Sequence, residues 1–189
     1  GCDLSGKPRI GSLTIISTIS PPGGDFNEPV TAATKRVVQG IWALDPKLAY
    51  LKHYPAIEWL NSYSNYPEYL IKWWKERNFE WNKTNLDWFE CRKQVNGILS
   101  HENEFKLVLQ LTGDLDLSEN QKLNHFMAKL IRNCFLIQNS YEKIDRFTGY
   151  KKLLALIKLI LLLYKEGKNL LEKGFKFDIN RFEEVLKKF

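Results

Sequence analysis

The pattern of apolar and polar positions changes along the chain from a strand pattern to a helical one. An apolar, partly β-branched run from Leu13 to Ile19 follows Gly11 and stops at Pro21-Pro22, which predicts a buried strand with an abrupt end. From about residue 67 the apolar spacing is helical to the end of the sequence. We therefore expect an α+β chain that is mostly α, with one domain in residues 1–66 and a helical domain in residues 67–189.

One helix is predicted between the strand and residue 66. Thr31 can cap a helix whose apolar positions, as far as Leu44, share one broad face, and Asp45-Pro46 is expected to end it. The proline of Tyr54-Pro55 favours an extended Tyr54. A single strand cannot satisfy its own backbone donors and acceptors. Either the chain dimerises through Leu13 to Ile19, or it completes a sheet that begins in another polypeptide.

The second part of the chain predicts a helical bundle. Ser118-Glu119-Asn120-Gln121 has the form of a capping box, which should open a helix running toward Asn139. Gly113 is expected to close the helix before it. The four expected helices span residues 85–111, from Ser118 toward Asn139, residues 149–173 and residues 178–188.

Composition and charge limit the classes of protein. With 189 residues, 44% hydrophobic and 13% aromatic, the chain is long and apolar enough to fold around a core of its own. The net charge is +6, and residues 1–70 hold six basic and six acidic groups, so the excess lies entirely in the remainder. An acidic protein surface or a nucleic acid could be the partner. The lysines alternate with glutamates, however, which favours a solvated helical surface and argues against nucleic acid.

Neither metal binding nor membrane insertion is predicted. Cys2, Cys91 and Cys134 are far apart, with no C-x-x-C and no histidine at ligand spacing, which is typical of a reducing compartment and of no metal site. No secretory signal pattern opens the sequence. The run from Leu153 to Tyr164 contains Lys158 and is shorter than the roughly 20 residues that a spanning helix needs. A helix buried among other helices is expected there.

The segment from Ser20 to Thr31 is a candidate ligand-binding loop. Its two glycines let the backbone approach another group closely, and open α/β sheets bind ligands at the ends of their strands. An ordinary strand-to-helix turn is the alternative. The sequence contains no G-x-x-x-x-G-K-[ST], so it offers no Walker-type loop for phosphates. Asp25 and Glu28 have no partner acid at a spacing that predicts catalysis.

Three stretches carry a family resemblance. They are Ser20 to Thr31 with its Pro-Pro-Gly-Gly-Asp-Phe run, His53 to Ser64 with Tyr-Pro-Ala, and Leu130 to Tyr141 followed by Asp145. In order and spacing the chain resembles the C-terminal part of the catalytic A subunit of archaeal A-type and vacuolar-type rotary ATPases, the ATP synthase alpha chain family. The resemblance implies that residues 1–66 are the C-terminal part of a nucleotide-binding domain, whose central sheet they complete with one or two strands. It also implies that residues 67–189 are the helical C-terminal domain.

The resemblance further implies the adenine side of an ATP or ADP site. Positions matching Phe26, Tyr54 and Tyr141 gather around adenine in that family, with Gln138 beside them. Stacking on one such ring is worth about 1–3 kcal/mol, and an amide can read the edge of the base. Phe26 could instead simply pin its loop to the core. The chain departs from the family's usual residues in three places, which are Ile137 for glutamine, Tyr141 for phenylalanine and Glu58 for asparagine.

In the family, the phosphate loop, the catalytic glutamate and the magnesium-linked aspartate all lie upstream of these stretches. The chain is therefore expected to hold no catalytic residue and no metal ligand, to be inactive alone, and to rely on a separate N-terminal portion that carries the P-loop and Mg²⁺. Its other implied partners are B subunits in an alternating hexamer and the central stalk, on the cytoplasmic face of a membrane that it does not enter itself. A non-enzymatic helical assembly module is the alternative, and it would have no reason to keep Phe26, Tyr54 and Tyr141 together.

Overall fold

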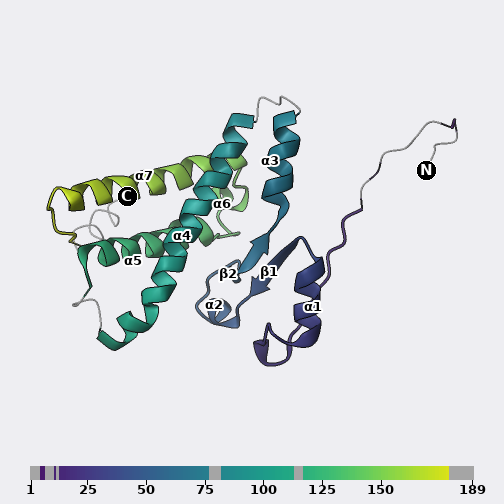
Figure 1. Ribbon diagram of the computed structural model, residues 1–189, viewed down its shortest axis with the longest axis horizontal. Helices are drawn as coiled ribbons and strands as arrows, with labels where there is room; N and C mark the ends of the chain where they lie inside the picture. The colour runs from purple at the N-terminus through teal and green to yellow at the C-terminus, as the bar shows by residue number, and fades with distance from the viewer. Residues whose placement is uncertain (1–4, 7–10, 12, 77–81, 113–116, 179–189) are drawn as a thin grey trace. The chain divides into compact units, whose positions relative to one another are not determined.

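The computed structural model describes residues 5, 6, 11, 13–76, 82–112 and 117–178 (Figure 1). The chain divides into two compact units, residues 1–38 and residues 39–189. The described residues are mostly helical, with a single two-stranded antiparallel sheet. The predicted fold class, a small β part followed by a helical domain, is confirmed.

The described residues of the first unit form a turn and one helix. Pro22–Gly24 form the 3-10 turn η1, in which Gly23 and Gly24 have φ of 64° and 73°, a left-handed conformation that suits glycine. Helix α1 spans Pro29–Val37. Its cap is Glu28, whose carboxylate accepts from the backbone N–H of Val30 at 3.0 Å and of Thr31 at 2.9 Å. The prediction that Thr31 caps this helix was wrong, because the longer glutamate side chain already satisfies these donors.

The predicted strand at Leu13–Ile19 does not form within this chain. Residues 13–21 have no regular secondary structure, and no strand in the described part of the chain pairs with them. Leu13, Ile15 and Ile16 are 81–85% exposed. The prediction that this run is buried was wrong. Among the described residues, no strand pairs with it and covers it.

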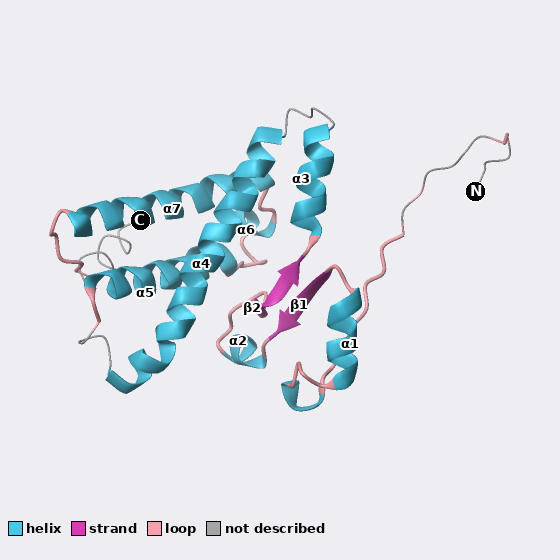
Figure 2. Cartoon of the chain, in the orientation of Figure 1, coloured by secondary structure: helices cyan, strands magenta, loops and turns pink. Residues whose placement is uncertain are grey.

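The second unit begins with the sheet. Strand β1 (Gly40–Leu44) pairs antiparallel with strand β2 (Ile57–Ser64), with Gly40 opposite Ser64 and Leu44 opposite Ile57 (Figure 2). The prediction of one helix from Thr31 to Leu44 was therefore wrong. Between Val37 and Gly40 the chain changes from helix to strand, because the β1 backbone pairs with a partner strand that local spacing does not reveal. Trp42 and Leu44, two residues apart, are both exposed.

A bulge interrupts the sheet between Ile41 and Ala43. There the N–H of Ala43 donates to Ser62 Oγ at 2.9 Å, and that hydroxyl donates to the Glu58 carbonyl at 2.6 Å. The Glu58 carboxylate accepts from the N–H of Leu60 at 3.0 Å and from the next N–H at 2.6 Å. Glu58 therefore satisfies backbone donors that the bulge leaves unpaired.

Three helices of the second unit share one hydrophobic core. Helix α4 (Asn82–Thr112) and helix α7 (Tyr150–Glu172) both pack against helix α5 (Glu119–Ile131) (Figure 1). Helix α3 (Tyr66–Glu76) leads from β2 to α4. Trp59 of β2 packs against this core, which joins the sheet to the helices. The buried core side chains are Cys91, Val95, Ile98, Leu99, Leu123, Phe126, Met127, Ala128, Leu130, Ile131, Leu154, Ile157 and Ile160.

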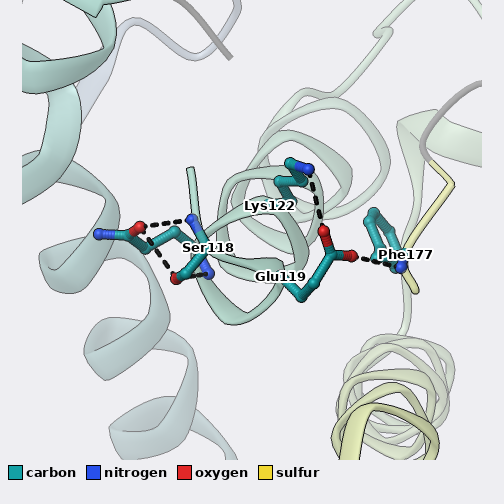
Figure 3. A network of polar contacts seen from close by, with 5 residues as sticks. Ser118, Glu119, Lys122 and Phe177 are labelled. Carbon is teal, nitrogen blue, oxygen red and sulfur yellow. Dashed lines mark hydrogen bonds and ion pairs between the residues drawn. The ribbon is translucent and has the colours of Figure 1, made fainter. Parts of the chain in front are cut away.

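The predicted capping box opens α5. Ser118 Oγ accepts from the N–H of Gln121 at 3.4 Å, and the Ser118 N–H donates to Gln121 Oε1 at 2.8 Å. Glu119 accepts from Lys122 Nζ at 2.9 Å and from the Phe177 N–H at 2.5 Å, which fastens the segment after α7 to the start of α5 (Figure 3). These bonds satisfy donors at the end of the helix that would otherwise be unpaired.

Replacing Ser118 by alanine should lower the free energy of unfolding by about 1 kcal/mol, because alanine lacks the hydroxyl that accepts from the Gln121 N–H. Urea denaturation followed by tryptophan fluorescence measures the change. Ser100→Ala is the matched control, because Ser100 is exposed inside α4, where alanine is the better helix former. An equal loss in both variants would contradict the capping role.

The other helix predictions largely hold. The helix predicted at residues 85–111 lies within α4, and Gly149 and Lys173 flank α7 as its caps. The helix from Ser118 ends at Ile131 rather than near Asn139, and a π turn, η3 (Arg132–Leu136), follows it. Gly113 and the helix predicted after Asp178 lie outside the described residues.

Helix α7 was predicted to be buried among other helices, and only one of its faces is. Leu154, Ile157 and Ile160 are in the core, whereas Leu159 and Leu162 are more than half exposed. None of the helices in the described ranges has the length and hydropathy that crossing a membrane requires.

Candidate functional site

Two loops of the second unit meet beside the sheet. The first loop runs from Asp45 to Ala56 and contains the short helix α2 (Pro46–Tyr50). Asp45 caps this helix, because its carboxylate accepts from the Lys47 N–H at 2.9 Å. The Ala56 carbonyl accepts from the Asp45 N–H at 3.0 Å, which closes the loop. Asp45-Pro46 therefore starts a helix, contrary to the prediction that it ends one. Near the end of the loop, His53 is buried and Tyr54 is 53% exposed, with a cis peptide bond between Tyr54 and Pro55.

The second loop follows the π turn η3. Asp145, in the short helix α6 (Lys143–Arg146), accepts from the Asn139 N–H through its carboxylate at 2.6 Å. The Arg146 side chain donates to the Ser140 carbonyl at 2.9 Å. These contacts close residues 137–148 into a defined loop, although nearly all of it is exposed. Tyr141 near its tip is 89% exposed.

A backbone hydrogen bond joins the two loops. The N–H of Gln138 donates to the carbonyl of Tyr54 at 2.7 Å. Tyr54 and Gln138, which are distant in sequence, are therefore direct neighbours, with Tyr141 three residues further along the second loop. The structure thus brings together two of the four residues predicted for the adenine site and places the third on the same exposed loop.

The amide of Gln138 already has a structural partner. Its Nε2 donates to the carbonyl of Asp145 at 2.7 Å. Gln138 is exposed, and in the described part of the chain its side-chain oxygen accepts no hydrogen bond. Gln138 therefore fixes its loop through the nitrogen of its amide, and the oxygen remains an available acceptor.

Phe26, the fourth predicted residue, lies in the first unit and is half-buried there. Lys35 Nζ lies 4.8 Å from the centroid of the Phe26 ring, a cation–π distance. Asp25 beside it accepts from the Asn27 N–H at 2.9 Å. Backbone N–H bonds lower the pKa of the capping residue Glu28. Both acids therefore stabilise the local turn and the start of α1.

A charged cluster next to the second loop was not predicted from the sequence. The Arg132 guanidinium forms a two-pronged contact with Glu102 of α4, with Nη2 2.6 Å from Oε1 and Nη1 on Oε2. His125 Nδ1 lies 3.2 Å from Oε1 of the same carboxylate. Glu102 is only 7% exposed. One signal could have found the pair, since Glu102 follows Ile98 and Leu99 at helical spacing and so lies on an apolar face.

The surroundings of Glu102 and His53 shift their pKa values. Burial raises the pKa of Glu102, but contacts with His125 and Arg132 outweigh it and lower the value to about 2. Burial, and next the charge of Arg132, lower the pKa of His53. The His53 ring lies 5.7 Å from Trp59, and no described residue is within hydrogen-bonding reach of its Nε2. The charge of Arg132 therefore affects the pKa of His53, the residue next to Tyr54.

Within the described ranges, no three histidine, cysteine, aspartate or glutamate side chains are grouped to hold a metal ion. Among the described residues, Cys91 and Cys134 form no disulfide, and burial raises the pKa of Cys134. The site in this chain is therefore a pair of joined loops that carry exposed aromatic rings and an amide oxygen. Such groups suit the stacking and edge recognition of a planar ligand.

Comparison with known families identifies the chain. Residues 3–64 match the model of the ATP synthase alpha/beta family, nucleotide-binding domain, and residues 77–179 match the C-terminal domain of V and A type ATP synthase. The chain belongs to the V- and A-type ATP synthase family. The predicted resemblance to the catalytic, or alpha, chain of these enzymes is confirmed.

The chain is similar to A subunits and alpha chains of ATP synthases. The chain is 44% identical over 172 residues to the A subunit of the A-type ATP synthase from Ignicoccus hospitalis, and the match covers 90% of this chain and 28% of that one. It is 39% identical over 186 residues to the V-type ATP synthase alpha chain of Halothermothrix orenii, covering 96% of this chain and 30% of that one. The chain thus spans less than a third of the length of these relatives.

A solved ATP synthase structure has a similar fold. The chain aligns with a structure described as a unique ATP synthase subunit, NeqB, from Nanoarcheaum equitans, with a TM-score of 0.63 and 22% identity. The match covers 84% of this chain and 36% of that one. At this identity the likeness concerns the fold, and the assignment to the ATP synthase family rests on the sequence matches.

Proposed function

We propose that the chain is the C-terminal portion of the catalytic A subunit of a rotary ATP synthase, working with a separate polypeptide that carries the P-loop. The observation that carries this proposal is the joined pair of loops, in which the N–H of Gln138 donates to the carbonyl of Tyr54 at 2.7 Å and both Tyr54 and Tyr141 are exposed. The sequence supplies an adenine side and lacks the motif that cradles phosphates. Two polypeptides together would complete one nucleotide site.

The first unit supports the need for a partner. Residues 13–20 have no regular secondary structure, expose Leu13, Ile15, Ile16 and Ile19, and find no strand partner among the described residues. A segment rich in β-branched residues can add as a strand to the open edge of another sheet, because backbone N–H and C=O groups pair there. In this proposal residues 1–66 complete the central sheet of the nucleotide-binding domain, and residues 67–189 form the helical domain that follows.

Each predicted site residue has a role in the proposal. Tyr54 and Tyr141 stack on the adenine of ATP or ADP, and the family resemblance assigns Phe26 to the same base. Gln138 presents its side-chain oxygen to the exocyclic amine of the base. The P-loop polypeptide binds the phosphates and Mg²⁺ and supplies the catalytic acid, so this chain alone does not hydrolyse ATP.

The helical domain has the second role. In the assembled enzyme, catalytic portions alternate with B subunits in a hexamer, and the helical domain contacts the central stalk. Opening and closing of the nucleotide site then accompany rotation of the stalk. The assembly lies peripherally on the cytoplasmic side of a membrane, which this chain contacts only through the complex.

Reconstitution tests the proposal. The chain, the P-loop polypeptide of the same organism and the matching B subunit, each purified, are mixed, and ATP hydrolysis is measured for each alone and for the mixture. We expect activity only in the mixture. Ile15→Pro should prevent assembly, because proline lacks the N–H that a strand ladder needs, whereas Ile15→Thr keeps both that donor and the β-branch. Hydrolysis by the chain alone, or normal assembly of Ile15→Pro, would contradict the proposal.

A further inference from the structure

A continuous set of contacts leads from the helical core to the second loop, residues 137–148. The carbonyl of Arg132 accepts from the N–H of Ile137 at 3.0 Å, which closes the π turn η3. The next residue, Gln138, donates to the carbonyl of Tyr54 at 2.7 Å. Single π turns redirect the chain at the end of a helix and are frequent at functional sites. The position of Arg132 thus determines where Gln138 meets Tyr54.

Glu102 holds Arg132 from the neighbouring helix. The contact is two-pronged, with the Arg132 Nη2 2.6 Å from the Glu102 Oε1 and Nη1 on Oε2, so it fixes the plane of the guanidinium as well as its distance. His125 lies on α5, before Arg132 in the sequence, and its Nδ1 is 3.2 Å from the same carboxylate. The buried Glu102 therefore ties α4 to the residue at which α5 becomes a π turn.

We propose that Glu102 and Arg132 are a positioning pair, which holds the π turn so that Gln138 stays bonded to Tyr54. The pair thereby couples the packing of α4 on α5 to the adenine site. Neither side chain touches the nucleotide, and each acts through the loop. The nucleotide part of the inference rests on the proposed function. The structural part, the control of the Gln138–Tyr54 bond, does not.

Stability alone is a weak explanation for this pair. The packing of α4 on α5 is already supplied by Leu99, Met127, Ile131 and their buried neighbours. A buried ion pair contributes little net stability relative to apolar residues of similar volume, because both charges lose their hydration. What it adds is a defined geometry. The pair fixes Arg132, the residue at which α5 ends and the π turn begins. A displacement of Arg132 would therefore also displace Gln138.

Hydrogen exchange of backbone amides in the full chain tests the structural part. The readout is the exchange rate of the Ile137 and Gln138 N–H groups relative to those of α5. In Glu102→Gln we expect both loop amides to exchange at least about tenfold faster relative to α5. Tyr164→Phe is the matched control, because it removes another interhelical contact, the 2.5 Å bond to Asn124 Oδ1, without touching the π turn. It should leave the ratio unchanged.

A double variant separates positioning from stability. Glu102→Leu/Arg132→Met replaces the pair by apolar residues and is expected to retain global stability. The inference predicts that the loop amides still exchange about tenfold faster in this variant. A ratio equal to that of the unmodified chain would overturn it, because the pair would then be only a link between helices. If either variant does not fold, Arg132→Lys provides the same test, since lysine keeps the charge but loses the two-pronged geometry.

Nucleotide affinity in the reconstituted complex tests the functional part. We expect the double variant to bind ADP about tenfold more weakly than the unmodified complex, with an unchanged rate of assembly. Faster loop exchange with unchanged ADP affinity would overturn the coupling to the adenine site. If the unmodified complex binds no nucleotide at all, the proposed function fails, and the exchange measurement still decides the role of the pair.

Discussion

Replacing Arg132 by methionine should lower the free energy of unfolding at pH 7 by about 3–5 kcal/mol, because it leaves the carboxylate of Glu102 buried without its guanidinium partner. Glu102 is 7% exposed, so water cannot readily take the place of the lost contact. Urea denaturation measures the loss. Adding Glu102→Leu should recover most of it, because the double variant carries no buried charge at this position. A single variant as stable as the unmodified chain would contradict the account of the charged cluster.

The same cluster predicts a dependence on pH. The pKa of Glu102 is lowered from the ordinary 4.5 to about 2, so the carboxylate contributes stability that is present above pH 4.5 and lost as the pH falls toward 2. The contribution is about 3 kcal/mol by linkage. The double variant lacks this carboxylate, so the stability difference between it and the unmodified chain should change across that window. A constant difference would show that Glu102 titrates at its ordinary pKa.

Replacing Tyr54 by alanine should weaken ATP binding by the assembled complex about 10- to 100-fold, because one stacked aromatic ring contributes about 1–3 kcal/mol. Equilibrium binding of a fluorescent ATP analogue, displaced by ATP, measures the change. Tyr54→Phe keeps the ring and should restore most of the affinity. Tyr69→Ala is the matched control, because Tyr69 is another exposed tyrosine of the same unit, in α3. Equal affinities for Tyr54→Ala and Tyr69→Ala would contradict the adenine role.

Local signals predicted the helical part of the fold well. The capping box at Ser118 and the limits of α7 near Gly149 and Lys173 are both present, because caps and helical spacing act over a few residues. The sheet was predicted poorly. Residues 40–44 have spacing that fits either a helix or a strand, and only the pairing with residues 57–64 decides between them. That pairing depends on contacts distant in sequence.

The candidate site shows the same limit. The family resemblance supplied Tyr54, Gln138 and Tyr141, but no sequence pattern indicates that the Gln138 N–H meets the Tyr54 carbonyl. The partnership of Glu102 with Arg132 was missed for the same reason, since the two lie on different helical segments thirty residues apart. A charged residue at an apolar helical position was the available signal.

The central claim is that this chain works as the C-terminal portion of a catalytic A subunit beside a separate P-loop polypeptide. Native mass spectrometry of the protein, purified from its own source without denaturation, tests this most directly. The account predicts a 22.2 kDa chain in an assembly that contains the P-loop polypeptide and the B subunit in equal numbers. A free monomer, a homodimer, or an assembly in which these residues occur only within one longer catalytic polypeptide would contradict it.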